Sequence, residues 1–219
     1  MKINFKETLL RLLILVFGLT IAHFGVTLFI LSNLGADTFN VLVQGIFRTI
    51  GAVLPFGFIT HGNVHMAICL IIILVLLIVD RSYVKAGTIV CMLLGGPIID
   101  LFTILLSPLF ENLESLWIRL LVTAIACAIL AFGMTIVIKS NAGTGPNDLV
   151  SVVLADKLKW KFSIVRVAVD IVFVLVGFWL GGTIGVGTII CAALVGPVAG
   201  LFLPINEKWI NKTVSKLIK

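Results

Sequence analysis

Residues 87–102 read GTIVCMLLGGPIIDLF, and residues 187–202 read GTIICAALVGPVAGLF. The two stretches align without a gap, and nine of their 16 positions are identical. A second pair, Ser-Asn-Leu-Gly at residues 32–35 and Ser-Asn-Ala-Gly at residues 140–143, occurs in the same order along the chain. Apolar composition alone produces scattered leucine and isoleucine matches, but it does not produce ordered Gly-Thr, Gly-Pro and Ser-Asn-x-Gly matches. The chain therefore contains an internal duplication.

The composition is that of a membrane protein. Of 219 residues, 60% are hydrophobic and 12% are charged, and the mean hydropathy is +1.24. Soluble domains have about 45–50% apolar and about 25% charged residues, so a soluble enzyme, a nucleic-acid-binding protein and a disordered chain are excluded. One helical crossing needs roughly 20 apolar residues. The length therefore predicts about six crossings in a single membrane domain over residues 1–219.

Hydropathy indicates six apolar stretches that could cross a bilayer. A backbone in hydrocarbon must satisfy its own hydrogen bonds, and no barrel-like alternation is present, so these stretches are predicted to be helices. An arrangement with eight crossings, which counts Thr38–Ile59 as a span, ranks lower because it places Arg81 and Lys85 outside. The predicted spans are Leu12–Leu31, Val64–Val79, Ala86–Leu106, Leu116–Ile138, Ile164–Leu180 and Thr183–Leu203.

The basic residues predict how these spans are oriented in a cell membrane. Cytoplasmic loops have an excess of Lys and Arg, whereas residues 107–115 include Glu111 and Glu114 and no basic residue. Both termini are therefore predicted to be cytoplasmic. The loops on that side hold 13 of the 16 basic residues: Lys2, Lys6, Arg11, Arg81, Lys85, Lys139, Lys157, Lys159, Lys161, Lys208, Lys212, Lys216 and Lys219.

Each repeat contains three spans, over residues 11–107 in the first half and 116–204 in the second. Because three is odd, the second repeat enters the membrane from the opposite side, and the repeats have inverted topology. The predicted fold class is an all-α membrane protein with six transmembrane helices in two inverted three-helix repeats. A short re-entrant or interfacial helix follows the first helix of each half. Inverted repeats are common in alternating-access transporters; a duplication without a transport role is the alternative.

The loop that begins at Ser140 is the most unusual segment of the chain. Gly143 and Gly145 allow close backbone approach or a positive φ, and Pro146 suits the first turn of a helix. The two residues after this proline then lie at a helix N-terminus, where backbone N–H groups favour an anion and the aspartate favours a cation or a proton. A capped interfacial helix is the alternative. The candidate substrate- or ion-binding residues of this loop are Asn141, Asn147 and Asp148.

A comparable polar stripe follows the first span. Asp37, Asn40, Gln44 and Arg48 are spaced by three and four residues, so they share one face of a short helix. This pattern is typical of an interfacial or re-entrant helix. Asp37 and Asn40 are the candidate binding residues of this segment.

Two charges fall inside the fifth span. Arg166 and Asp170 are four residues apart and share one helix face, and charges at membrane depth cost about 2.5–3.5 kcal/mol each on insertion scales. They are interpreted as a substrate or proton site, in which Arg166 could bind a carboxylate or phosphate in bidentate fashion. The alternatives are a structural ion pair and an Arg166 side chain that reaches the interface near Lys161.

Glycines and prolines recur at matching positions of the third span in each half. Small residues let transmembrane backbones approach closely, and a proline kinks or interrupts its helix. Interrupted helices at corresponding positions point to a transporter site. The residues assigned a structural or gating role are Gly143, Gly145, Pro146, Gly87, Gly96, Pro97, Gly187, Gly196 and Pro197.

Histidines and cysteines predict neither a metal site nor a cofactor. His61 and His65 are four residues apart, but a metal site needs a third and a fourth ligand, and no such cluster is evident. The four cysteines lie in apolar stretches and are expected to be reduced packing residues. Since hydrolase, phosphate-loop, zinc and haem motifs are absent from the sequence, no enzymatic activity is expected. The cysteines are Cys69, Cys91, Cys127 and Cys191.

The ordered polar and glycine motifs resemble those of the YczE/YyaS/YitT family of bacterial integral membrane proteins. The motifs are NAGTGPND at residues 141–148, Arg166 with Asp170, GGTIGVGT at residues 181–188, and Gly196-Pro197. The resemblance covers essentially the whole chain and implies a multi-pass membrane protein, in a family of largely unassigned activity. The first half departs from the pattern, because residues 34–38 lack the proline and no counterpart of Arg166 is evident.

The leading functional hypothesis is a small permease that moves an unidentified small solute or ion by alternating access. The alternative is a non-transporting membrane partner, either a substrate-binding subunit of a larger transporter or an accessory factor for membrane-linked biosynthesis. Under either hypothesis the protein is expected to contact the lipid bilayer and to bind no nucleic acid. A homodimer and a complex with a partner membrane subunit both stay open.

Overall fold

A computed structural model of the protein describes residues 5–53, 61–111 and 113–217. Within these ranges the chain forms helices and no strand. The elements are α1 (Phe5–Ser32), α2 (Thr38–Val53), α3 (His61–Asp80), the short 3-10 helix η1 (Arg81–Tyr83), α4 (Ala86–Phe110), α5 (Leu116–Lys139), α6 (Pro146–Leu158), α7 (Phe162–Trp179) and α8 (Val186–Leu217).

Six helices are long and apolar enough to cross a membrane, namely α1, α3, α4, α5, α7 and α8. The prediction of an all-α protein with six membrane spans is confirmed at this level. Large apolar side chains such as Ile78 and Ile104 are exposed on α3 and α4, as expected for a surface that faces lipid. The described part of α2 comprises 16 residues up to Val53, and the rest of the alternative span Thr38–Ile59 lies outside the described ranges.

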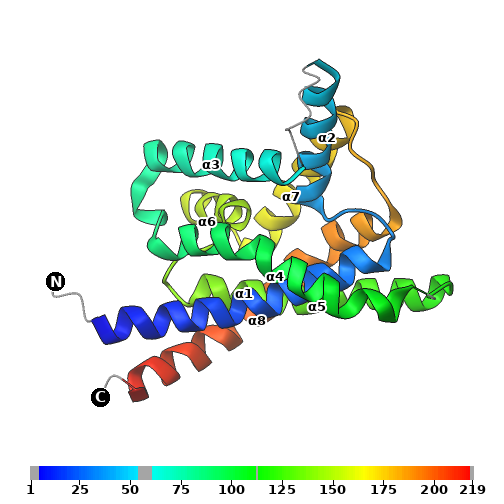
Figure 1. The fold of residues 1–219 in the computed structure, drawn as a ribbon. Helices are drawn as coiled ribbons and strands as arrows, with labels where there is room; N and C mark the ends of the chain where they lie inside the picture. The colour runs from blue at the N-terminus through cyan, green and yellow to red at the C-terminus, as the bar shows by residue number, and fades with distance from the viewer. Residues whose placement is uncertain (1–4, 54–60, 112, 218–219) are drawn as a thin grey trace.

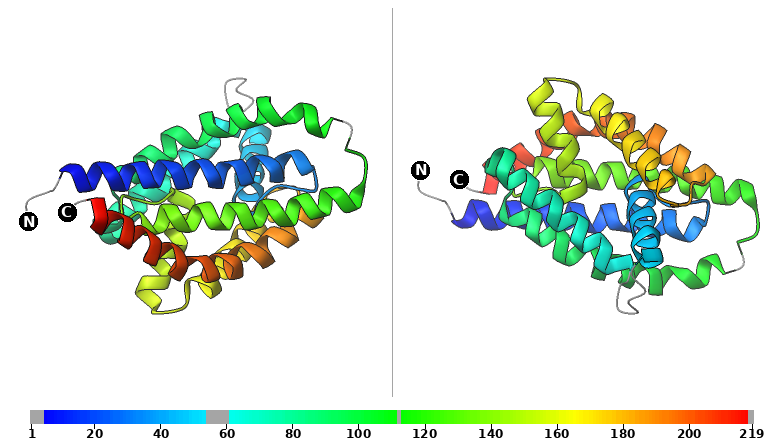
Figure 2. Two further views of the ribbon diagram at one scale, coloured as in Figure 1. Left: turned by 90° about the horizontal axis from the view of Figure 1, so that it is seen from below. Right: turned by 90° about the horizontal axis from the view of Figure 1, so that it is seen from above.

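The long helices α4, α1, α5 and α8 lie side by side in that order and form one layer (Figure 2). The central helices α1 and α5 are antiparallel and make the most extensive contact in the structure. The helices α3, α2, α7 and α6 lie on one side of this layer (Figure 1). In this second group, α2 packs against α7, and α6 contacts both α3 and α7.

Glycines let α1 and α5 touch backbone to backbone. A Cβ atom at Gly25 would lie 2.6 Å from the Leu130 nitrogen, and one at Gly133 would overlap the backbone of Ala22. Small residues at such a crossing are what allows transmembrane helices to approach closely. The two contacts also fix the antiparallel register of the central pair.

Two arginines cap the ends of this central pair. Arg119 of α5 donates from Nε to the Ser32 carbonyl at the end of α1, at 2.8 Å, and Arg11 of α1 donates from Nη1 to the Ser140 carbonyl after α5, at 3.1 Å. The last carbonyl groups of a helix have no partner within the helix, and a cation there also complements the helix dipole. Each central helix therefore stabilises the C-terminal end of the other.

The four cysteines are free thiols buried among apolar side chains, as the sequence predicted. Cys127 of α5 and Cys191 of α8 belong to the largest apolar cluster, together with Phe29 of α1. This cluster holds α8 against the central pair.

The prolines of α4 and α8 do not interrupt these helices. Pro97 lies inside α4 and Pro197 inside α8, and both helices continue as α-helix across them. The expectation that these prolines interrupt the third helix of each half is therefore wrong, whereas a kink at these prolines stays a prediction. Each of these prolines leaves one carbonyl in the preceding turn without its usual partner, a loss that does not end a helix extending a dozen or more residues beyond it.

Candidate functional site

The candidate site is built around Arg166, which lies in the second turn of α7. Its Nε donates to Oδ2 of Asp170 at 3.0 Å, and its Nη1 donates to Oδ1 of Asp148 at 2.6 Å. The exposed fraction of the side chain is 5% for Arg166 and 0% for Asp170. The four-residue spacing within α7 thus yields the predicted ion pair, and α6 supplies a second carboxylate to the same guanidinium.

The start of α6 positions Asp148. Gly145 is the residue before the helix, and Pro146 occupies the first turn, where its missing N–H would have had no partner within the helix. Asn147 donates from Nδ2 to Oδ1 of Asp148 at 3.2 Å. The exposed fraction of the Asp148 side chain is 17%, so Asp148 is the more accessible of the two carboxylates bound by Arg166.

The start of α2 meets the same group of charges. The Thr38 hydroxyl donates to Oδ1 of Asp170 at 2.6 Å. The Asn40 amide donates to both carboxylate oxygens of Asp37 at 2.9 Å. Burial raises the pKa of Asp37 to about 6, although hydrogen bonds from Asn40 and the charge of Arg166 oppose this rise.

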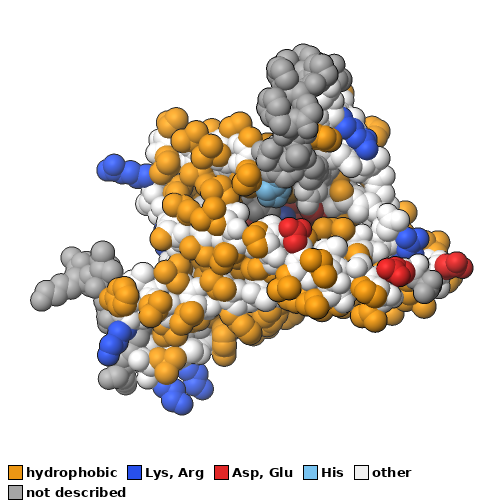
Figure 3. Space-filling model, in the orientation of Figure 1, with side chains coloured by type: hydrophobic (Ala, Val, Ile, Leu, Met, Phe, Trp, Pro, Cys, Tyr) orange, Lys and Arg blue, Asp and Glu red, His pale blue; other side chains and the backbone are white. Residues whose placement is uncertain are grey.

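We call Asp37, Asp148, Arg166 and Asp170 the charge cluster. Arg166 forms ion pairs with Asp148 and Asp170, and the carboxyl group of Asp37 accepts hydrogen bonds from Asn40. A buried excess of carboxylates favours a cation or a proton over an anion. Figure 3 shows that the molecular surface is hollowed between α2, α3 and α4, with basic, acidic and histidine side chains visible inside the hollow.

Two loops near the site are hydrogen-bonded to the first turns of α4 and α8. In the first, which we call the α4 joint (residues 87–88 and 142–144), the Gly87 N–H donates to the Ala142 carbonyl at 2.9 Å. The Thr144 N–H donates to Oγ1 of Thr88 at 3.4 Å. Gly143 has φ +152°, and a Cβ there would overlap the backbone of Thr88. Glycine is therefore required at position 143 for both conformation and space.

The second loop forms the same arrangement, which we call the α8 joint (residues 34–36 and 185–188). The Gly187 N–H donates to the Leu34 carbonyl at 2.8 Å, and the Thr188 hydroxyl donates to the Ala36 carbonyl at 2.6 Å. Gly35 has φ +134°, and a Cβ there would lie 2.7 Å from Oγ1 of Thr188. The duplicated Ser-Asn-x-Gly and Gly-Thr motifs are therefore partners of each other across the two halves.

The other two residues of the α2 stripe lie away from the charge cluster. Gln44 accepts from the Thr183 N–H at 2.7 Å and also from the Thr183 hydroxyl, and Arg48 donates to the Gly181 carbonyl at 2.6 Å. This part of the stripe holds the loop between α7 and α8. The structure therefore divides the stripe, leaving Asp37 and Asn40 at the site.

Three further candidates have other places. Asn141 is exposed, has φ +61°, and its carbonyl accepts from Lys85 at 2.9 Å. A Cβ at Gly96 would meet nothing within 4 Å, so this glycine makes no close helix contact. A Cβ at Gly196 would lie 2.8 Å from the Ser163 carbonyl, so Gly196 does allow α8 to approach α7.

The rings of His23 and His65 lie against residues of α1, α2 and α4. The ring of His65 packs edge-on against Phe39, with centroids 5.2 Å apart. His23 donates from Nδ1 to the Leu19 carbonyl at 2.8 Å, and its Nε2 faces Gly95 of α4. The His61 side chain lies outside the described residues. Over the ranges that were searched, no three His, Cys, Asp or Glu side chains are grouped so as to hold a metal ion.

Sequence reasoning did not identify Thr38, Arg11 or Arg119. The signal for all three is the 108-residue separation that already relates Ser32 to Ser140. The same separation relates Arg11 to Arg119, and it relates Thr38 to Pro146, the first residue of α6. Extending the repeat from the matched motifs to every position would have paired the two arginines and placed Thr38 at the start of a helix equivalent to α6.

The fold and the charge cluster define a multi-pass α-helical membrane protein with one ion pair within α7 and another between α7 and the start of the short helix α6. The chain belongs to the family of unknown function DUF6198, whose model matches residues 9–204. This bears out the resemblance that the polar and glycine motifs indicated.

Three relatives match most of the chain. The uncharacterized membrane protein YczE of Bacillus subtilis (strain 168) is 26% identical over 212 residues, which cover 96% of this chain and 94% of the relative. An uncharacterized protein of Haemophilus influenzae is 29% identical over 192 residues, 88% of this chain and 83% of the relative. The uncharacterized protein YyaS of Bacillus subtilis is 25% identical over 191 residues, 87% of this chain and 91% of the relative. No solved structure matches the chain.

Proposed function

We propose that the protein is a small permease of the cell membrane that moves a cation by alternating access. The observation that carries this proposal is the charge cluster, which holds three carboxyl groups and one guanidinium, with ion pairs from Arg166 to Asp148 and Asp170. Ionisable groups among transmembrane helices by default mark ion pathways or proton relays. Since Arg166 is engaged by Asp148 and Asp170, an anionic substrate would have to displace one of them. We propose that the protein acts as a permease without enzymatic activity, and we assign no catalytic residue.

The architecture we propose is a pair of inverted three-helix repeats. The reciprocal caps support it, because Arg11 with Ser140 and Arg119 with Ser32 exchange under a shift of 108 residues. Gly35 and Gly143, which both have positive φ in their joints, are related by the same shift. In Figure 2, α1 runs opposite to α5 and α4 runs opposite to α8, as two inverted halves require.

We propose that α2 and α6 are re-entrant helices. With 13 residues, α6 extends about 20 Å, which is less than the ~30 Å of a bilayer core. The described part of α2, Thr38–Val53, extends about 24 Å. Their first residues, Thr38 and Pro146, are buried beside the charge cluster. Helices that begin in the interior next to charged groups are typical of transporter sites.

The orientation we propose places both termini in the cytoplasm. The first turn of α1 and the last turn of α8 lie at the same end of the molecule (Figure 1). On the face in Figure 3, basic side chains lie at both ends, and acidic side chains lie near the end opposite to the termini. Positively charged loops are favoured on the cytoplasmic side. The α4 joint then faces the cytoplasm, and the α8 joint faces outward.

In the proposed cycle the two joints open alternately. Each joint consists of a few hydrogen bonds between a loop of one half and a helix start of the other, such as the Gly87–Ala142 and Gly187–Leu34 bonds. Opening the α4 joint would connect the charge cluster to the cytoplasm, and opening the α8 joint would connect it to the outside. Because the joints are equivalent, the two open states can be close in free energy.

The test is cation flux by the purified full chain in proteoliposomes. Pyranine trapped inside reports proton movement after Na+, K+, guanidinium or tetramethylammonium is added outside. We expect protein-dependent flux with at least one of these cations, and at least a ten-fold loss in Asp148→Asn. Asp100→Asn is the matched control, because it removes an exposed carboxyl group from α4.

Two results would reject the permease. One is the same flux in the folded Asp148→Asn protein as in the wild type. The other is the absence of flux with all four cations, together with co-purification of a second membrane subunit at fixed stoichiometry. The second result would favour the alternative of a non-transporting partner in a larger complex.

A further inference from the structure

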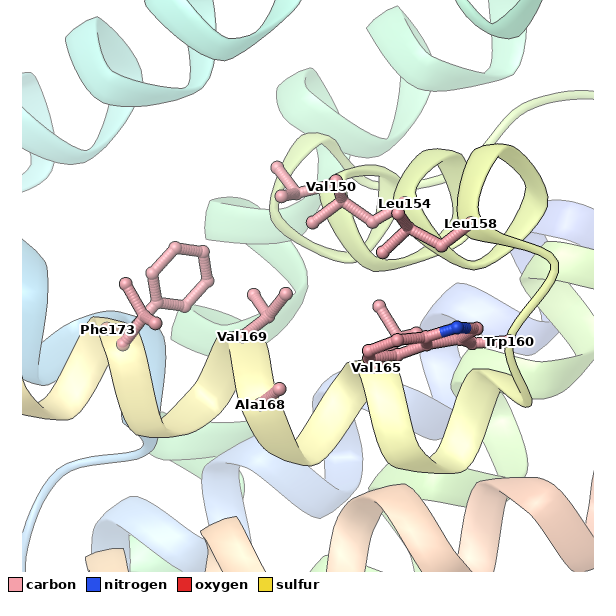
Figure 4. Close-up of a pocket in the computed structure, with 9 residues that line it drawn as sticks. Val150, Leu154, Leu158, Trp160, Val165, Ala168, Val169 and Phe173 are labelled. Carbon is pink, nitrogen blue, oxygen red and sulfur yellow. The ribbon is translucent and has the colours of Figure 1, made fainter.

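An apolar groove runs between α6 and α7 on the outside of the molecule (Figure 4). Its volume is about 260 Å³. Leu154 and Leu158 of α6 form one wall, and Ala168 and Val169 of α7 form the other. The groove-lining side chains of α7 extend from Val165 to Phe173, which corresponds to about 12 Å along the helix.

One end of the groove is closed by the turn Lys159-Trp160-Lys161. The Trp160 indole lies across the groove from Leu158 (Figure 4). Lys159 ends α6 with φ +57°, and the Trp160 N–H donates to the Ala155 carbonyl at 3.1 Å, so the turn has a defined backbone.

The two lysines of this turn are exposed and uncompensated. Neither takes part in an ion pair within the described parts of the chain. Lys157, one turn earlier, does have a partner, because its Nζ lies 3.1 Å from Oδ2 of Asp80. The groove therefore has an apolar interior and a doubly positive mouth.

We propose that this groove binds an anionic phospholipid, with one acyl chain between α6 and α7 and the phosphate on Lys159 and Lys161. Tryptophan prefers the interface between headgroups and hydrocarbon, and lysines near the membrane surface attract anionic lipids. Under the orientation proposed above, the lipid belongs to the cytoplasmic leaflet. Since α6 and α7 hold Asp148 and Arg166, the bound lipid also braces the two helices that share the central ion pair.

The test is native mass spectrometry of the detergent-solubilised full chain with phosphatidylglycerol or phosphatidylcholine of identical acyl chains. We expect the wild type to retain phosphatidylglycerol about ten-fold or more in preference to phosphatidylcholine. The double variant Lys159→Gln/Lys161→Gln should lose this preference. The matched control Lys212→Gln/Lys216→Gln removes two exposed charges from the end of α8 and should keep it.

A second pair of variants tests the groove itself. Ala168→Phe fills the groove and should lower retention of both lipids, whereas Ala193→Phe adds the same ring to an exposed position of α8 and should not. Equal retention of the two lipids by the wild type would overturn the proposal, as would equal losses in the two lysine double variants. Because the measurement involves no flux, its failure would leave the permease proposal standing.

Discussion

Removing the Arg166 guanidinium would leave the carboxylates of Asp148 and Asp170 without their shared cation. Breaking a buried ion pair by deleting one partner costs about 3–5 kcal/mol. We expect Arg166→Gln to lower the melting temperature of the detergent-solubilised protein strongly, as followed by tryptophan fluorescence. The melting temperature of Arg166→Lys should lie between those of the wild type and Arg166→Gln. Lysine keeps the charge but lacks the planar guanidinium that binds both carboxylates.

Arg48→Gln is the matched control for this prediction. Arg48 donates a hydrogen bond to the Gly181 carbonyl at an exposed position, and the loss of such a bond costs about 1 kcal/mol. The double variant Arg166→Gln/Asp170→Asn should recover part of the stability lost in Arg166→Gln, because it removes one of the two unpaired charges. Equal melting temperatures for Arg166→Gln and Arg48→Gln would contradict the role given to the ion pairs.

The raised pKa of Asp37 predicts that the stability of the folded protein depends on pH. Burial raises its pKa in the folded protein from 3.8 to about 6. The folded state therefore holds the proton more tightly than the unfolded state, so this contribution to stability is complete below pH 4 and is lost as the pH rises through 6. We expect the melting temperature to fall between pH 4 and pH 6, by roughly 2–4 °C for each kcal/mol lost.

Asp37→Asn should flatten this pH profile, because an amide has no proton to release in this range. Asp100→Asn, which removes an exposed carboxyl group, should leave the wild-type slope in place. The assignment fails if the slope between pH 4 and pH 6 is the same in Asp37→Asn as in the wild type.

At the scale of elements, the joints depend on single glycines. Gly143→Ala would place a methyl group into the backbone of Thr88 and would strain a residue with φ +152°. Neither the neighbouring backbone nor the loop can move away cheaply, so we expect a loss above 1 kcal/mol. The measurements are the yield of monodisperse protein and its melting temperature.

Gly96→Ala, a substitution within α4, is the control for Gly143→Ala. A Cβ at Gly96 meets nothing within 4 Å, and replacing a helical glycine by alanine stabilises by roughly 0.5–1 kcal/mol. A Gly143→Ala protein as stable as Gly96→Ala would show that the α4 joint does not need this glycine.

Hydropathy located the long helices but not all of their ends. The predicted spans Leu116–Ile138 and Ile164–Leu180 agree with α5 and α7 to within two residues at each end. The predicted span Thr183–Leu203 ends 14 residues before the end of α8, because the helix continues beyond its apolar part into a charged segment. Hydropathy marks only the part of a helix that lipid can cover.

The partners of the buried charges were harder to predict than the helices. The Arg166–Asp170 pair follows from its four-residue spacing, which any α-helix imposes. The Arg166–Asp148 and Thr38–Asp170 hydrogen bonds could not be predicted in this way. Periodicity identifies the faces of a helix but not the helix that packs against each face. The interruption expected at Pro97 was wrong, since one missing N–H does not end a long helix that neighbouring helices support.

At the scale of the whole molecule, the proposed orientation predicts which ends of the chain can be labelled from outside. Glu114→Cys lies between α4 and α5, and Ser215→Cys lies near the end of α8; both positions are exposed. An impermeant maleimide should label Glu114→Cys in intact cells and Ser215→Cys only after permeabilisation. The native cysteines are buried, so labelling of the wild-type protein gives the background signal. Labelling of Ser215→Cys in intact cells would reverse the orientation.

The reciprocal capping of α1 and α5 has a consequence for biogenesis. When residues 5–110 have left the ribosome, the Ser32 carbonyl lacks Arg119 and the Leu34 carbonyl lacks Gly187, because both partners are synthesised later. At that stage the C-terminal end of α1 lacks its partners from α5 and α8. We therefore expect the first part of the chain to reach its final packing only after the second part has been inserted.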